Sequence, residues 1–401
     1  MLIVQKFGGS SVADAERVFR VANRIVDTYR QGNEVVVVVS AQGDTTDDLI
    51  DKANEINPNA SKREMDMLLS AGEQISIALL AMAIEKLGCP VVSLLGWQAG
   101  FLTNSTYSAA RIKTVNSERI RAELDRKKIV IVAGFQGINK YDDITTLGRG
   151  GSDTSAVAIA ASMRADLCQI YTDVEGVYTA DPRKIPSAKK LEEITYDEML
   201  ELATLGAQVL NNRSVEMAKK YSIELEVLSS IVHAPGTKVK ETVKMEKMLV
   251  KGVAKDLDIA RVMIVGLPDE PGVAFKVFSR VAKAHVNVDL IIQSVGRDGT
   301  KDITFTVKKS DAQKTVDALQ EYCDHLGAKK LYFETDVAKI SVVGAGLETH
   351  EGFAARMFEA LSDKNINIQT ISTSEIKVSV LIDDADADVA TAAVHDAFFG
   401  E

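Results

Sequence analysis

The chain has 401 residues, of which 46% are hydrophobic and 26% are charged, and its formal net charge is −10. This length suits two or three domains of about 100–200 residues each, and the composition excludes extended disorder. The acidic balance argues against a nucleic-acid backbone or an anionic membrane surface as a partner, so we expect neither.

Three widely separated cysteines, Cys89, Cys168 and Cys323, predict neither a disulfide framework nor a metal site. No signal-peptide pattern opens the sequence, so we expect a reducing, cytoplasmic location. The longest apolar runs, at 35–39 and 75–84, are shorter than the roughly 20 residues that a membrane span requires.

Residues 1–236 alternate short β-branched runs with longer amphipathic stretches. This alternation predicts an α/β domain with a largely parallel sheet sandwiched by helices, in which ligands bind beyond the carboxyl ends of the strands. The predicted strands are 2–5, 34–40, 90–95, 128–133, 167–172 and 224–228. The predicted helices are 13–29, 63–87, 116–126, 153–163 and 208–220.

An internal repeat follows a polar, lysine-rich connection. Arg261–Gly266 matches Lys339–Gly344, and from Gly272, which falls opposite Gly352, a constant offset of 80 residues relates the two copies. Each copy has the pattern of a strand, a helix, two strands and a second helix, which predicts two ferredoxin-like βαββαβ units. The predicted elements are strands 288–293, 302–307, 368–372 and 377–382, and helices 312–326 and 386–398.

The first chemical motif is Lys6–Ser11 (KFGGSS), at the end of the first predicted strand. Its glycines let backbone N–H groups approach a phosphate, and a helix N-terminus adds partial positive charge. Ser10 and Ser11 suit helix capping or donation to phosphate oxygens, and Lys6 suits neutralisation of a transferring phosphoryl group. A tight strand–helix turn explains the motif as well, and it is not a P-loop because no G-x-x-x-x-G-K-[ST] occurs.

The second motif is Gly148–Asp153 (GRGGSD), at the start of another predicted helix. Arg149 carries a planar guanidinium that suits a carboxylate. Asp153 is explained as well by a favourable interaction with the helix dipole. Two glycine-rich helix starts in one α/β domain, each with a cation, predict two anions that face each other.

A third motif, Ser40–Asp47 (SAQGDTTD), offers small hydroxyl groups to a polar substrate, although a capped helix start explains Asp44 or Thr45 equally well. Glu73 interrupts an apolar stretch, and we predict that it reaches into a cleft to meet an ammonium group. An exposed helical glutamate is the ordinary alternative.

The fourth motif is the loop Tyr171–Arg183, which follows a predicted buried strand. It suits a segment that wraps a nucleoside, with Asp173 near the ribose or a metal and Arg183 near phosphate. A plain surface loop is the alternative.

Together, the segments KFGGSS, SAQGDTTD, LSAGEQ, GRGGSD and YTDVEGVYTADPR resemble the aspartate kinases of the amino-acid kinase family, in that family's order and over nearly the whole chain. The repeated units resemble paired ACT domains, which are regulatory modules that bind amino acids. The resemblance implies transfer of the γ-phosphoryl of ATP to the β-carboxylate of L-aspartate, with Mg²⁺ bridging the phosphates. The product would be 4-phospho-L-aspartate, which enters lysine, threonine and methionine biosynthesis.

The resemblance also implies a role for each matching residue. Lys6 and Asp153 would form the catalytic centre, with Asp153 organising the site around Lys6. Glu73 would hold the amino group of aspartate and Arg149 its α-carboxylate. The aspartate site would comprise Thr45, Glu73, Arg149, Gly150, Gly151 and Ser152. The nucleotide site would comprise Lys6, Gly8, Gly9, Ser10, Ser40, Thr172, Asp173, Tyr178, Asp181 and Arg183. No protein side chain is predicted as a metal ligand.

For regulation, the resemblance implies feedback by lysine, threonine or both, in a homo-oligomer whose ACT units pair between chains. A dimer, a tetramer or an assembly with a separate regulatory subunit are all open. A strand before the first unit, 249–255, would complete the sheet of the second. The predicted divisions are 1–236, a linker 237–248, 249–335 and 336–401. The predicted effector residues are Asp269, Gly272, Val273, Ala274, Asn287, Val288, Asp289, Gln293, Asn367 and Ile368.

One departure from the family pattern is Gln208, where relatives commonly carry a lysine that helps to bind the nucleotide. Its absence predicts altered ATP binding. Asn211–Arg213 also differs from the frequent His-Pro-Arg form.

Two alternatives to the aspartate kinase remain open. A carboxylate kinase of the same fold could act on glutamate or N-acetylglutamate, although the GRGGSD and LSAGEQ segments and the tandem units argue against it. A non-catalytic amino-acid sensor is the other, and the presence of Lys6, Arg149 and Asp153 argues against that.

Overall fold

The structure is a computed structural model of the chain, and it describes residues 1–204, 209–242, 249–295, 299–345, 347 and 352–400. Two compact units form. One comprises Met1–Thr179 with Lys189–Glu246, and the other comprises Ala180–Ala188 with Lys247–Glu401.

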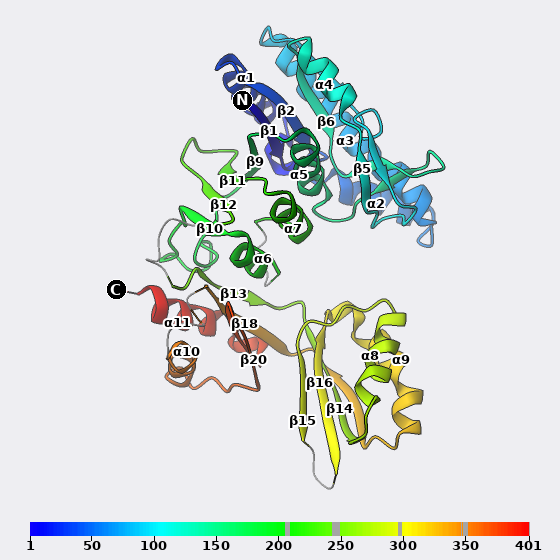
Figure 1. The fold of residues 1–401 in the computed structure, drawn as a ribbon, viewed down its shortest axis with the longest axis vertical. Coiled ribbons are helices and arrows are strands. Elements are labelled where there is room, and N and C mark those ends of the chain that lie inside the picture. The colour runs from blue at the N-terminus through cyan, green and yellow to red at the C-terminus, as the bar shows by residue number, and fades with distance from the viewer. Residues whose placement is uncertain (205–208, 243–248, 296–298, 346, 348–351, 401) are drawn as a thin grey trace. The chain divides into compact units, whose positions relative to one another are not determined.

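The first unit is built on an eight-stranded sheet with the order β10-β12-β11-β9-β1-β2-β6-β3 (Figure 1). From β11 to β3 every neighbouring pair is parallel, whereas β11 and β12 are antiparallel. The strands are β1 (Leu2–Phe7), β2 (Glu34–Val39), β3 (Val91–Leu94), β6 (Ile129–Ala133), β9 (Leu167–Thr172), β10 (Glu193–Thr195), β11 (Leu225–Ser229) and β12 (Thr237–Lys240).

Helices cover both faces of this sheet. Helices α1 (Ala15–Arg30) and α3 (Lys62–Lys86) pack on one face, and α4 (Glu118–Asp125) and α5 (Gly151–Met163) pack on the other. Because β2 is buried on both faces, it is a run of five valines after Glu34 rather than an alternating strand.

The sequence of α1 shows why this segment is helical and where the helix begins. The buried residues of α1, such as Val18, Ala22 and Ile25, recur every three or four positions. The side chain of Asp14 accepts a hydrogen bond from the backbone N–H of Arg17 at 2.9 Å and so caps the helix.

Helix α3 is long and apolar enough to span a membrane by length and composition, the one such helix found in the described part of the chain. However, 56% of its most apolar window is buried inside the fold, and the helix also buries Asp66 and Glu73. These features are those of a core helix.

The first unit also contains a smaller sheet with the order β5-β4-β7-β8. The sequence did not predict these strands, nor β10 and β12, because strands of three or four residues carry little periodic signal. Helices α2 and α6 were not predicted either. The remaining elements of this unit are β4 (Phe101–Thr103), β5 (Ile112–Val115), β7 (Gln136–Ile138), β8 (Ile144–Thr146), α2 (Thr45–Ile56), α6 (Tyr196–Thr204) and α7 (Asn212–Tyr221).

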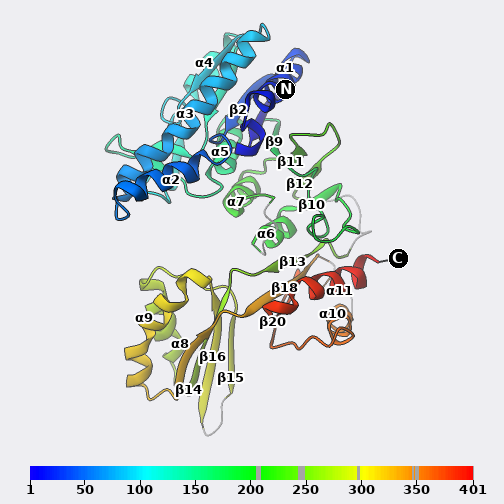
Figure 2. The ribbon, with the colours of Figure 1, turned by 180° about the vertical axis from the view of Figure 1, so that it is seen from behind.

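The second unit contains two four-stranded antiparallel sheets, ordered β15-β16-β14-β17 and β13-β18-β20-β19. Helices α8 and α9 lie side by side on one face of the first sheet (Figure 2), and α10 and α11 cover the second. The first repeat comprises β14 (Ala260–Pro268), α8 (Val273–Lys283), β15 (Ile291–Val295), β16 (Thr300–Val307), α9 (Ala312–His325) and β17 (Lys330–Glu334). The second comprises β18 (Val337–Val343), α10 (Phe353–Ser362), β19 (Thr370–Ser374), β20 (Lys377–Asp383) and α11 (Ala387–Phe399).

Strand β13 (Gly252–Asp256) precedes the first repeat in the chain but pairs with β18 of the second, from Gly252 opposite Val343 to Asp256 opposite Lys339. A segment before the first repeat therefore contributes an edge strand to the second sheet. The predicted divisions at 236, 248 and 335 stay predictions.

The predicted fold class is confirmed: a largely parallel sheet between helices, then two ferredoxin-like units. Element bounds shift by a few residues. Helix α1 begins at Ala15 rather than at residue 13, α7 begins at Asn212 rather than at 208, and β15 begins at Ile291 rather than at 288.

Candidate active site

The carboxyl ends of β1, β2, β6 and β9 lie at one edge of the large sheet, because these strands are parallel neighbours. A cavity of about 460 Å³ opens at this edge. It is lined by Lys6, Gly8, Gly9, Ser40, Ala41, Gly43, Thr46, Asp47, Ile50, Leu69, Glu73, Ser108, Phe135, Thr146, Gly148, Arg149, Gly150, Gly151, Ser152 and Asp153. Ligands of open α/β sheets bind at such an edge.

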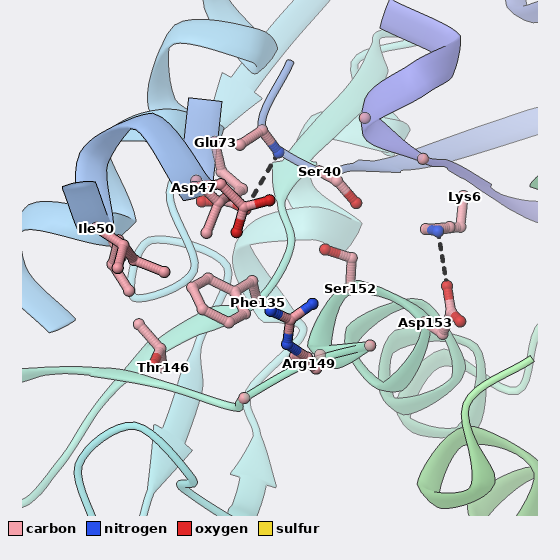
Figure 3. Close-up of a pocket in the computed structure, with 18 of the residues that line it drawn as sticks. Lys6, Ser40, Asp47, Ile50, Glu73, Phe135, Thr146, Arg149, Ser152 and Asp153 are labelled. Atoms are coloured by element: carbon pink, nitrogen blue, oxygen red, sulfur yellow. Dashed lines mark hydrogen bonds and ion pairs between the residues drawn. The ribbon is translucent and has the colours of Figure 1, made fainter. Parts of the chain in front are cut away.

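Lys6 and Asp153 form an ion pair inside this cavity. The Lys6 Nζ lies 2.8 Å from the Asp153 Oδ1, and the two side chains are 13% and 11% exposed (Figure 3). Lys6 comes from β1 and Asp153 from the first turn of α5. Asp153 is therefore more than a partner of the helix dipole, since it holds the ammonium group at the cavity wall.

The glycine-rich turn after β1 packs tightly against the loop after β2. A Cβ on Gly9 would lie 2.5 Å from the carbonyl oxygen of Ala41, so a larger residue would force the two loops apart. The prediction that Ser10 and Ser11 cap a helix is wrong: a short 3₁₀ helix, Gly9–Val12, has no side-chain cap, and Asp14 caps α1. Ser10 remains available to a ligand.

The second glycine-rich turn starts helix α5. Gly150 is the N-cap residue, directly before the first turn of the helix. Its φ of 70° lies in the left-handed region that favours glycine. The exposed side chain of Arg149 reaches toward the cavity between Phe135 and Ser152 (Figure 3). Within the described residues its guanidinium makes no ion pair and no hydrogen bond.

Glu73 is 3% exposed, so the alternative of an exposed helical glutamate is excluded. One carboxylate oxygen, Oε1, accepts a hydrogen bond from the backbone N–H of Ala41 at 3.1 Å, and the other, Oε2, is buried without a hydrogen-bond partner among the described residues. Burial raises the pKa of Glu73 to about 7, against a smaller lowering by backbone hydrogen bonds. A buried carboxylate with one unsatisfied oxygen on a cavity wall suits a cationic ligand.

The loop after β2 contributes Ser40, Thr46 and Asp47 to the cavity. Thr45 is not among the lining residues, and its hydroxyl donates to the carbonyl oxygen of Gln42 at 2.6 Å. Its predicted contact with a substrate stays a prediction.

A second cavity of about 440 Å³ is lined by Ser10, Asp173 and residues of α1 and of the loop after β11. Thr172 donates from its hydroxyl to Asp173 at 3.0 Å. Among the remaining predicted nucleotide residues of this loop, Tyr178 pairs with Lys190 in an isolated β-bridge. Asp181 and Arg183 pair with each other at 3.0 Å, in a segment that belongs to the second unit. Their contact with a nucleotide stays a prediction.

Comparison with known proteins identifies the family. The model of the amino acid kinase family matches residues 1–229, and that of the ACT domain matches residues 262–322 and 340–398. The chain belongs to the amino acid kinase family. The proposed resemblance is thereby confirmed.

Two similar relatives that match nearly the whole chain are named aspartokinases. That of Mycolicibacterium smegmatis is 51% identical, and that of Corynebacterium glutamicum 50%, each over 403 residues that cover 99% of this chain and 96% of the relative. A crystal structure of Escherichia coli aspartokinase III with aspartate and ADP, in the R-state, is 25% identical, with a TM-score of 0.87 over all of both chains. The crystal structure of aspartate kinase from Synechocystis is 47% identical with a TM-score of 0.56, and the match covers 99% of this chain and 69% of that one.

Several residues that line or support the site of this amino acid kinase were missed in the sequence. Ser108, Phe135 and Thr146 line the cavity, and Asp66 bonds to two of them. The available signal was Asp66 itself, a charged residue in the same apolar stretch that made Glu73 stand out. Gln208 lies outside the described residues.

Most of the predicted effector residues lie in the first ACT repeat, and Asn367 and Ile368 lie in the second. Asp269 and Gly272 lie before α8, where Asp269 pairs with Lys301 at 2.7 Å and Gly272 has a φ of 90°. Asp289 lies between α8 and β15 and forms an ion pair with Lys339 of β18. The remaining positions are Val273 and Ala274 at the start of α8, Asn287 and Val288 after it, Gln293 on β15, and Asn367 and Ile368 before β19.

Proposed function

We propose that this chain transfers the γ-phosphoryl of ATP to the β-carboxylate of L-aspartate and releases 4-phospho-L-aspartate and ADP. The observation that carries the proposal is the pairing of charges in the first cavity. Arg149 presents an unpartnered guanidinium and Glu73 an unsatisfied carboxylate oxygen, as judged within the described residues. Such a pair matches the α-carboxylate and the α-ammonium of an amino acid.

The relatives support aspartate as that amino acid. Proteins 50% and 51% identical over nearly the whole chain are named aspartokinases, and the E. coli enzyme with a TM-score of 0.87 was crystallised with aspartate and ADP. With its two α-groups held by Arg149 and Glu73, the substrate directs its β-carboxylate toward Lys6 and the glycine-rich turns.

Lys6 and the two glycine-rich turns would provide the charge and the donors for phosphoryl transfer. A carboxylate is already a nucleophile, so the reaction needs in-line placement and charge neutralisation more than a general base. Lys6, held by Asp153 at 2.8 Å, supplies a fixed positive charge. Backbone N–H groups of the turns at Gly8 and Gly150 add fixed donors.

ATP would extend from this cavity toward the second one, where Ser10 and Asp173 lie. Mg²⁺ bound to the nucleotide would neutralise the β- and γ-phosphates. The residues present fit this ion, because the cavity wall offers the carboxylates Asp47 and Asp153, and Mg²⁺ on a nucleotide takes one or two carboxylates besides phosphate and water. Asp153 is the carboxylate best placed to contribute.

Regulation by lysine, threonine or both would act through the ACT repeats of a cytoplasmic homo-oligomer. The support is a second crystal structure of E. coli aspartokinase III, with lysine and aspartate in the T-state, 25% identical and with a TM-score of 0.75. The two ACT matches in this chain provide the corresponding modules.

The decisive experiment traps acyl phosphate as the hydroxamate at saturating MgATP, with aspartate, glutamate or N-acetylglutamate as acceptor. We expect product with aspartate at least about tenfold faster than with the others, because both α-groups must be recognised. Product with N-acetylglutamate, whose amino group is blocked, would overturn the assignment of Glu73. No product with any acceptor would identify a sensor.

A further inference from the structure

The loop that carries Arg149 is held by side chains that do not line the cavity. This loop, Thr146–Gly150, connects β8 to α5. It lies beside the segment Ser108–Ala110, where the N–H of Ala110 donates to the carbonyl oxygen of Thr146 at 2.9 Å. Two charged side chains, Asp66 and Arg213, each form hydrogen bonds to both segments and so hold them together.

Asp66 of α3 holds the end nearest the cavity. Its carboxylate, which is fully buried, accepts from the backbone N–H and the hydroxyl of Ser108 and from the backbone N–H and the hydroxyl of Thr146, at 2.8–3.2 Å. A carboxylate that receives this many donors is held in one orientation. Asp66 itself is not a cavity residue, whereas Ser108 and Thr146 are.

Arg213 of α7 holds the other end. One guanidinium nitrogen, Nη1, donates to the carbonyl oxygen of Leu147 at 2.7 Å, and the other, Nη2, donates to that of Ala110 at 3.0 Å. Burial lowers the pKa of Arg213, and nearby Arg111 lowers it further, although an arginine stays charged. The hydrogen bonds to the two carbonyl groups offset the free-energy cost of burying the guanidinium.

Asn211, the N-cap residue of α7, contacts both Arg213 and Arg149. Its side-chain oxygen accepts from the backbone N–H of Arg213 at 3.0 Å and caps the helix, while its Nδ2 donates to the carbonyl oxygen of Arg149 at 3.1 Å. The packing is close: a Cβ on Gly150 would lie 2.2 Å from this Nδ2. The start of α7 therefore fits against the loop on both sides of Arg149.

We propose that Arg213 and Asn211, opposed by Asp66, are positioning residues that fix the Arg149 guanidinium for the carboxylate of the substrate. The inference rests on the proposed function of Arg149. Since Arg149 has no side-chain partner of its own in the described structure, its placement depends on its backbone. Loss of that placement weakens recognition of the substrate carboxylate before it affects the phosphoryl donor site.

The test uses steady-state kinetics of the full-length protein. Asn211→Ser keeps a capping oxygen for α7 but removes the donor to Arg149, and Arg213→Lys retains the charge but not the two-pronged contact. We expect the KM for aspartate to rise about threefold for Asn211→Ser and about tenfold or more for Arg213→Lys, with the KM for MgATP unchanged. Lys219→Met, on the same helix and paired with Asp197, is the matched control and should change neither constant.

A double-mutant cycle separates positioning from simple destabilisation. In an Arg149→Lys background, which already lacks the fork that Arg213 positions, Arg213→Lys should raise the KM for aspartate less than about twofold further. An equal loss in both backgrounds, or an unchanged KM for aspartate in the single variants, would overturn the proposal. If the unsubstituted chain itself forms no aspartyl hydroxamate, the proposed function fails instead, so the two failures are distinguishable.

Discussion

Two lysine–aspartate pairs occupy different regions of this chain, and their surroundings distinguish a pair that can meet a ligand from a pair that is enclosed by the protein. Lys6 and Asp153 lie on a cavity wall at the carboxyl ends of parallel strands. Lys339, whose side chain is 4% exposed, pairs with Asp289 and lies 3.8 Å from Asp256. The first lysine faces space for a ligand, whereas the second is enclosed by carboxylates of the protein.

The second pair connects three elements of the regulatory unit. Lys339 is on β18 of the second repeat, Asp256 is on β13, and Asp289 lies between α8 and β15 of the first repeat. Asp289 was predicted to contact an effector, but in the structure an internal ammonium group already neutralises it. Because the Asp289 side chain is 40% exposed, an effector that uses this carboxylate would either share it with Lys339 or displace that ammonium group.

The largest effect is expected at the cavity pair. Lys6→Ala should lower turnover by about three orders of magnitude while the protein stays folded, because a fixed charge is lost where we propose that the phosphoryl group transfers. The measurement is the hydroxamate assay together with a circular-dichroism melting curve. Lys62→Ala, an exposed lysine at the start of α3, is the control. Turnover within about tenfold of the unsubstituted protein would remove Lys6 from the mechanism.

The next effect concerns Glu73 and depends on pH. Its pKa is about 7, so as pH falls through this value the free protein protonates the carboxylate that would hold the substrate ammonium. We expect the KM for aspartate to rise about tenfold between pH 8 and pH 6. Glu73→Gln should have a KM raised about 30-fold or more and nearly independent of pH. Glu85→Gln, exposed on the same helix, should retain the pH dependence.

The same shift predicts a sign for stability. Between pH 4.5 and about 7 the folded chain holds a proton on Glu73 that the unfolded chain has released. This carboxyl therefore makes the folded state less stable as pH rises through that window. Glu73→Gln should remove that slope in urea titrations, and an unchanged slope would show that another group causes it.

Much of this arrangement could be predicted from the sequence, for a physical reason. Parallel strands end at one edge, so motifs that follow β1, β2 and β9 must lie near one another. The second motif joins them because helix α5, which begins at Gly151, crosses beneath β1. Family membership and the paired regulatory modules were predictable from motif order and from the repeat.

The supporting contacts were not predictable. Asp66 and Arg213 bond to backbone groups at least 40 residues away, such as the N–H of Ser108 and the carbonyl group of Ala110. Backbone groups carry no sequence signal, so neither partner is visible before the fold is known. The Lys339–Asp289 pair was hidden for a related reason: it joins two repeats whose relative placement depends on how β13 pairs with β18.

A further prediction concerns the Lys339–Asp289 ion pair in the regulatory unit. Asp289→Ala should weaken amino-acid inhibition and spare uninhibited activity, and it should also destabilise the regulatory unit by about 1–3 kcal/mol because Lys339 stays buried with a more distant partner. Lys339→Met should be the milder change for stability, since Asp289 is 40% exposed and can be hydrated. Inhibition curves with lysine, threonine and both, and melting curves, measure the two effects. Unchanged inhibition in both variants would place the effector elsewhere.

The smallest effect is expected at Gln208, and it tests whether a second lysine besides Lys6 improves nucleotide binding. The family resemblance predicts a nucleotide-binding lysine where this chain has Gln208, so Lys6 would here act on the phosphates without that second ammonium. Gln208→Lys should lower the KM for MgATP about three- to tenfold, the gain from one additional partly screened charge near phosphate, and should leave the KM for aspartate unchanged. Gln74→Lys, an exposed position on α3, controls for the added charge. If the KM for MgATP does not fall, a lysine at position 208 does not contribute to nucleotide binding in this chain. Lys6, paired with Asp153, would then be the lysine on which the proposed reaction depends.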